Sequence, residues 1–141
     1  MIDFQEMRRL IRVKSHLEEA IARTEANATK RTASLSKSGG GGKGSTSSRV
    51  EEGAVALAIL REEYNQVSNE LNKHQAELKR YLRYLSEVER SIMRMRYMEG
   101  ISCHEIAVAV CYSYYHVFHI VQAAESKINK RLRAPGKDSK P

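Results

Sequence analysis

The sequence has no long apolar run and few cysteines, and each absence excludes a class of protein. No window approaches the ~18 consecutive apolar residues that a transmembrane helix requires. The first residues lack the basic, apolar and small-residue order of a secretory signal. Cys103 and Cys111 are too close in sequence for a disulfide between them to link distant parts of the chain. We therefore expect a cytoplasmic protein with reduced thiols and no membrane partner.

Motifs for catalysis and metal binding are missing as well. Cys103, Cys111, His116 and His119 are not spaced like zinc ligands, because a structural zinc module places its first pair about two to four residues apart. The pair His104-Glu105 has no second histidine at the helical spacing of a metalloprotease, and the glycine run at 39–42 precedes no phosphate-loop helix. We expect no enzymatic activity, no cofactor and no metal.

Positive charge is present in excess and is unevenly distributed. The 141 residues include 24 Lys and Arg against 17 Asp and Glu. Residues 1–75 hold 12 basic and 10 acidic side chains, whereas residues 76–141 hold 12 and 7. A basic C-terminal half is typical of nucleic-acid binding, although a membrane surface, an acidic partner or a need for solubility would favour the same excess.

Changes in composition and helix-capping patterns divide the chain into five segments. Apolar residues at three- and four-residue intervals predict an N-terminal amphipathic helix within residues 1–33, from about Asp3 to Thr32. Ser, Gly and Lys at 34–48 predict a flexible linker. Ser48 with Glu51 forms a capping-box pattern that predicts the start of a long helix over 49–85. A domain at 86–132 and a basic tail at 133–141 complete the chain.

The long helix carries an unbroken seven-residue apolar repeat, which predicts an all-α helical hairpin or coiled coil. One set of repeat positions is Val50, Leu57, Tyr64, Leu71, Leu78 and Leu85, and the other is Gly53, Leu60, Val67, His74, Tyr81 and Val88. We call these two sets the seam. Its partner is either the N-terminal helix folded back across the linker or the same helix of a second chain, and both pairings are compatible with the pattern. A homodimer through the coiled coil is the expected assembly.

Short capped helices follow the seam. Ser86 with Glu89 is a second capping box, and the helix that it opens ends at Gly100. Ser102 with Glu105 opens another helix, and Ser113 caps the last one. Two helices joined by a short turn predict a C-terminal helix-turn-helix. Cys111 occupies the turn position where glycine is common, so we expect a turn that is strained or differently shaped.

The last helix of a helix-turn-helix enters the DNA major groove, and residues around it hold phosphates. On this basis the predicted DNA-binding residues are Ser113, Tyr114, Tyr115, His116, Phe118, His119, Gln122, Lys127, Lys130, Arg131, Arg94 and Arg96. The helix has no Arg or Lys from Ser113 to Gln122, so bidentate contacts to guanine are not available there. Gln122 can bind adenine and Phe118 can meet thymine methyls, which favours A·T pairs. The exposed aromatic residues are also compatible with a protein-binding surface.

The run Arg94–Leu132 resembles region four of bacterial sigma factors, with Glu-Ile-Ala at 105–107 and Ser113, Val117, Ala124 and Ile128 in matching places. With a helical N-terminal half and a Gly/Ser interruption, the chain is similar in layout to phage transcriptional regulators of the ArpU/RinA type. The resemblance implies a double-stranded DNA-binding regulator in a bacterial host cell that activates late genes and contacts host RNA polymerase. The alternatives are a phage DNA-packaging adaptor of the small-terminase kind and a protein-binding module for RNA polymerase.

Overall fold

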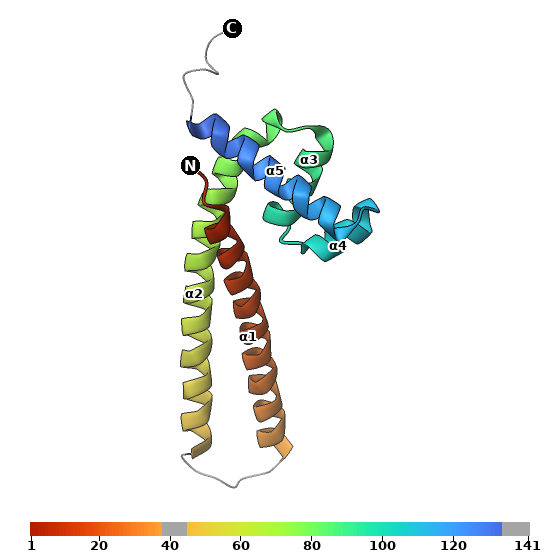
Figure 1. Ribbon diagram of the computed structural model, residues 1–141. Helices are drawn as coiled ribbons and strands as arrows, with labels where there is room; N and C mark the ends of the chain where they lie inside the picture. The colour runs from red at the N-terminus through yellow and green to blue at the C-terminus, as the bar shows by residue number, and fades with distance from the viewer. Residues whose placement is uncertain (38–44, 134–141) are drawn as a thin grey trace. The chain divides into compact units, whose positions relative to one another are not determined.

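The computed structural model describes residues 1–37 and 45–133, and every regular element in these ranges is helical. The predicted all-α fold is therefore confirmed. In chain order the elements are α1 (Phe4–Lys37), α2 (Ser45–Tyr81), the 3₁₀ helix η1 (Leu82–Tyr84), α3 (Glu87–Met93), the π-helix η2 (Arg94–Met98), α4 (Cys103–Val110) and α5 (Tyr114–Arg133), as Figure 1 shows.

The helices on either side of the predicted linker extend further into it than the sequence indicated. Helix α1 continues to Lys37 and α2 begins at Ser45, so both ends of the predicted linker 34–48 are helical, while residues 38–44 lie outside the described residues. Ser48 lies inside α2 and not at its N-cap, so the first predicted capping box was wrong. Residues 45–48 are all serine or threonine, and such similar side chains do not single out one cap. The predicted tail beyond Arg133 also lies outside the described residues.

Two helices predicted as continuous change geometry before they end. Helix α2 stops at Tyr81, and η1 follows before Leu85 adopts an extended backbone. The helix after Ser86 is α-helical only to Met93 and then becomes the π-helix η2, where the N–H of Glu99 donates to the Arg94 carbonyl at 3.1 Å. Apolar periodicity does not distinguish these tighter and wider turns from α-helix, so the sequence could not reveal them.

The chain forms two compact units. Among the described residues, the core unit comprises 1–11 and 70–133, and the hairpin unit comprises 12–37 and 45–69. The predicted domain at 86–132 is thus part of a larger compact unit that also takes in the first residues of the protein. Sequence patterns do not reveal this association, because residues 1–11 and 70–85 show only ordinary amphipathic helix patterns.

In the hairpin unit, α1 and α2 pack against each other in opposite directions. The Lys14 ammonium of α1 lies over the Tyr64 ring of α2, 5.8 Å from its centroid. The Tyr64 hydroxyl donates a hydrogen bond to the Glu18 carboxylate at 3.1 Å. Further along both helices, Arg61 pairs with Glu25 at 2.7 Å. The seam residues Leu57, Leu60, Tyr64 and Val67 are half-buried. The seam therefore packs against the chain's own N-terminal helix.

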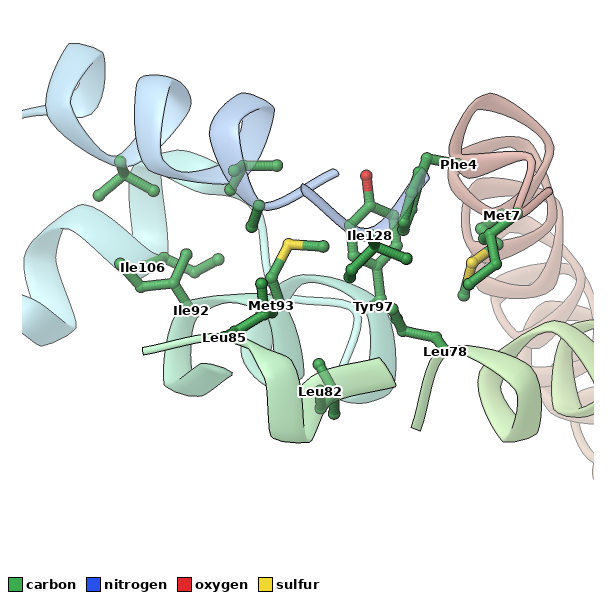
Figure 2. Packing of buried hydrophobic residues seen from close by; sticks show 14 of the residues in the cluster. Phe4, Met7, Leu78, Leu82, Leu85, Ile92, Met93, Tyr97, Ile106 and Ile128 are labelled. Atoms are coloured by element: carbon green, nitrogen blue, oxygen red, sulfur yellow. The ribbon is translucent and has the colours of Figure 1, made fainter. Parts of the chain in front are cut away.

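The core unit is built around side chains from both ends of the chain. Phe4 and Met7 of α1 join residues of α2, α3, η2 and α5, and Met7, Leu78, Ile92, Met93 and Tyr97 have no exposed surface. Figure 2 shows Phe4 beside Tyr97 and Ile128, with Met7 on the same helix nearby. The other members of this buried cluster are Ile2, Leu82, Leu85, Ile106, Ala107, Val117, Val121 and Ala124. The N-terminal segment therefore completes the core that holds α5.

Tyr97 is the polar centre of this core. Its ring lies 5.2 Å from that of Phe4, and its hydroxyl donates to the Glu125 carboxylate. Arg8 donates to the Tyr97 hydroxyl at 2.8 Å and to Glu125 at 2.9 Å. Burial and the adjacent Glu125 carboxylate raise the pKa of Tyr97 well above its ordinary value, so the phenol keeps its proton and donates it. The Ile2 N–H also donates to Asn129 on α5 at 3.3 Å.

This arrangement predicts that Met7→Ala destabilises the C-terminal helices. Loss of a fully buried Met side chain should lower the free energy of unfolding by about 2–5 kcal/mol, and amide hydrogen exchange of residues 117–128 should accelerate. Gln5→Ala, at an exposed position of the same segment, is the control and should change neither quantity. Unchanged exchange of α5 in Met7→Ala would show that the N-terminal segment is not part of this core.

Candidate nucleic-acid interface

Helices α4 and α5 are joined by a three-residue connection with well-defined ends. The Ser102 hydroxyl accepts from the Glu105 N–H at 3.2 Å and caps α4, and the Ser113 hydroxyl accepts from the His116 N–H at 3.1 Å and caps α5. Cys111 closes α4 with a left-handed backbone, φ 59°. The turn therefore has the left-handed shape that glycine usually adopts. A non-glycine residue in this region costs about 1–2 kcal/mol, which makes the turn strained.

The chain turns by 108° between α4 and α5. Ala107 and Ile106 of α4 are buried in the same apolar cluster as Val117 and Val121 of α5. This angle and connection fall in the range of helix-turn-helix motifs. Among the described residues, no single helix is long and apolar enough to cross a bilayer; α4 and α5 pass that length and composition test only as this bent pair.

An aromatic surface surrounds the α4–α5 connection. We call it the aromatic face, and its members are His104, Tyr112, Tyr114, Tyr115, His116, Phe118 and His119, all exposed. The Tyr114 ring stacks on His104 at 4.2 Å between centroids and on Phe118 at 6.2 Å. Tyr115 is the most exposed of its tyrosine and phenylalanine members, with 73% of its surface exposed. These contacts link the first turn of α4 to the first two turns of α5.

The structure brings the predicted reading residues together on this surface. Tyr114, Tyr115, His116, Phe118 and His119 belong to the aromatic face, and Gln122 is exposed one turn beyond His119 and Phe118. Ser113 has a structural role as the cap of α5. Sequence periodicity missed His104 and Tyr112, because a helical repeat places residues on one helix only. The contact between His104 and Tyr114 depends on the turn between the helices.

Several predicted phosphate-binding side chains instead hold the protein together. Lys127 pairs with the buried Glu89 at 2.8 Å, and the Arg96 guanidinium donates to the Ile101 carbonyl at 3.5 Å. The Arg131 guanidinium lies 3.5 Å from the centroid of the Tyr84 ring. Arg94 and Lys130 are exposed, and the side chain of neither forms a hydrogen bond or ion pair with the part of the chain that the structure describes. These two are the predicted cations most accessible to a phosphate.

The Glu89–Lys127 pair shows why a basic side chain beside the last helix need not face DNA. Burial opposes ionisation of Glu89, but hydrogen bonds from Lys127 and Ser86 outweigh it and lower the pKa of this carboxyl below its ordinary value. Ser86 also receives the Glu89 N–H at 3.3 Å, so the predicted second capping box is confirmed. The pair therefore fastens the start of α3 to α5.

We predict that Lys127→Gln lowers the free energy of unfolding by about 1–3 kcal/mol at neutral pH, because the buried carboxylate loses its charged partner. The stabilisation is present above the ordinary carboxyl pKa and fades as the pH falls through the lowered pKa of Glu89. Lys130→Gln, one turn away and exposed, should leave stability unchanged. Denaturant unfolding at neutral and acidic pH measures the free energy of unfolding of both variants. If Lys127→Gln is as stable as the wild-type protein at neutral pH, Lys127 has no structural role.

Comparison of the chain with protein-family models, with curated proteins and with solved structures gave no match.

Proposed function

We propose that this protein binds double-stranded DNA through α4 and α5 and regulates transcription. The observation that carries the proposal is a 108° helix pair whose second helix begins with exposed side chains able to form hydrogen bonds and apolar contacts. Arg94 and Lys130 supply accessible positive charge beside it. The resemblance of Arg94–Leu132 to sigma-factor region four extends the proposal from DNA binding to transcription, and the ArpU/RinA-like layout extends it to activation of phage late genes.

The chemistry of the aromatic face sets the expected sequence preference. Without Arg or Lys at the start of α5, bidentate recognition of guanine is not available. Gln122 offers both a donor and an acceptor for adenine, and Phe118 offers apolar surface for thymine methyl groups. A·T-rich sites should therefore bind best.

We predict that selection from a random-sequence duplex pool enriches an A·T-rich site and that Gln122→Ala relaxes the preference at one position, at a cost of about 1–3 kcal/mol. Ser126→Ala, one turn further along the exposed side of α5, is the matched control and should keep the wild-type preference. Lys130→Gln should weaken every duplex alike and reduce the salt slope by about 0.9. Equal binding of all duplexes by the wild-type protein would contradict sequence-specific recognition.

The aromatic face also favours a second candidate, a protein-binding module whose partner is RNA polymerase. Exposed tyrosine and phenylalanine side chains are frequent anchors of protein interfaces. Phe118→Ala distinguishes the two functions. Loss of polymerase binding with unchanged duplex affinity supports the protein-binding module, whereas loss of affinity for A·T-rich duplexes supports the DNA-binding regulator.

We further propose that the protein acts as a homodimer paired through the hairpin unit. A single module buries little DNA surface, and two-fold pairing lets two half-sites be read together. Because α1 covers the seam, a second chain needs another surface. Val55 and Ile59 are 59% and 55% exposed on α2, one turn apart, and present apolar surface opposite the seam. This pair is the proposed contact between chains.

Replacement of Val55 and Ile59 by glutamate should convert the dimer to a monomer without loss of helicity, since like charges would meet across the interface. Sedimentation equilibrium and far-UV circular dichroism measure the two quantities. Ala22→Glu with Ala26→Glu, at the same spacing on exposed positions of α1, is the matched control and should remain dimeric. A wild-type monomer, or a dimer that survives the Val55 and Ile59 changes, would contradict this pairing, and a ring-sized oligomer would favour the packaging adaptor.

A further inference from the structure

The aromatic face lies in the part of the chain that is poorest in positive charge. No Lys or Arg occurs between Arg96 and Lys127, although the protein carries 24 of them. The same stretch holds three carboxylates, Glu99, Glu105 and Glu125. DNA presents a dense row of phosphates, so a surface that approaches it without cations forgoes the attraction that usually dominates affinity.

Histidines are concentrated where lysine and arginine are absent. Of the five histidines in the chain, His104, His116 and His119 all belong to the aromatic face. Each has an aromatic neighbour: His104 stacks on Tyr114 at 4.2 Å, His116 meets the edge of Tyr112 at 4.6 Å, and His119 lies 6.0 Å from Phe118. A protonated imidazole beside an aromatic ring gains a cation–π attraction.

Most charged groups of the elements packed around this face are already engaged. Glu89 pairs with Lys127, and Glu125 pairs with Arg8. Arg90 and Arg96 donate to backbone carbonyls, the first to Leu82 and Leu85 and the second to Ile101. The other charged groups on α3, η2, α4 and the turn between η2 and α4 are Glu87, Arg94, Glu99 and Glu105. With neutral imidazoles, the start of α4 and its preceding turn therefore carry only negative charge.

We propose that DNA binding is coupled to proton uptake by His104, His116 and His119, which become the cations of the aromatic face when phosphates approach. The inference rests on the proposed DNA-binding function and specifies how that site is regulated. Three added charges would outnumber the carboxylates of Glu99 and Glu105 on α4 and its preceding turn. The protein would thus bind duplexes more tightly in mildly acidic conditions.

The direction of the effect follows from proton linkage. A group that holds its proton more firmly beside phosphates increases the affinity for DNA. The increase is complete at a pH where the free protein is already protonated, and it is lost as the pH rises. Histidine is the side chain whose charge responds to changes around neutral pH, so the comparison is between mildly acidic and mildly basic solution. Each histidine that holds its proton tenfold more firmly in the complex adds up to about tenfold in affinity.

The test is fluorescence anisotropy of a labelled mixed-sequence duplex with the full-length protein at pH 6 and pH 8, over a salt series at matched ionic strength. We expect affinity to be at least about tenfold higher at pH 6, with a salt slope steeper by about 0.9 for each histidine that gains a phosphate contact. The triple change His104→Gln, His116→Gln, His119→Gln should remove the pH dependence, and His119→Gln alone should remove part of it.

His16→Gln with His74→Gln, which removes the two remaining histidines, is the matched control and should retain the full pH dependence. Thermal melts at both pH values establish that each variant is folded. Duplex binding that does not vary with pH, or a pH dependence that survives the triple change, would overturn the coupling while leaving DNA binding intact. If the protein binds no duplex at pH 6 and none at pH 8, the proposed function and the coupling are both overturned.

Discussion

The buried Tyr97 phenol, held between Glu125 and Arg8, is the interaction on which the core unit depends. It joins the first helix of the chain to the last one and to η2, and Phe4 packs on its ring. The phenol is fully buried and its two partners are partly buried, so loss of either partner would leave a buried polar group with fewer hydrogen bonds. The 1–11 segment is thereby tied into the structure that presents α4 and α5.

That rigid support matters because the proposed DNA-binding surface has an uncommon composition. Affinity for duplexes ordinarily comes from lysine and arginine, yet here those residues precede α4 or lie in the second half of α5, and the surface around the α4–α5 connection is aromatic and histidine-rich. Some flanking cations, Lys127 above all, stabilise the fold. We propose that exposed cations such as Arg94 and Lys130 contact phosphates and that the aromatic face discriminates among base pairs.

Features governed by neighbouring residues were predictable, whereas those governed by distant residues were not. Ser86, Ser102 and Ser113 cap helices as predicted, and Gly100 takes the positive φ expected after a helix. The sequence could not show that Met7 completes the core of α5 or that Lys127 reaches Glu89, 38 residues away. The predicted helix start at Ser48 was wrong because the neighbouring serine and threonine residues are equally suited to cap a helix. The predicted DNA-contacting residues from Tyr114 to Gln122 lie near one another because they occupy the first turns of a single helix.

The most direct test of the account is an amide chemical-shift titration of the full-length protein with an A·T-rich duplex at pH 6. If α4 and α5 bind DNA, the amides of residues 103–122 should shift most, with smaller changes near Arg94 and Lys130 and none over residues 51–69. Shifts confined to the hairpin unit, or a titration that leaves residues 103–122 unchanged, would contradict the assignment of the DNA-binding surface.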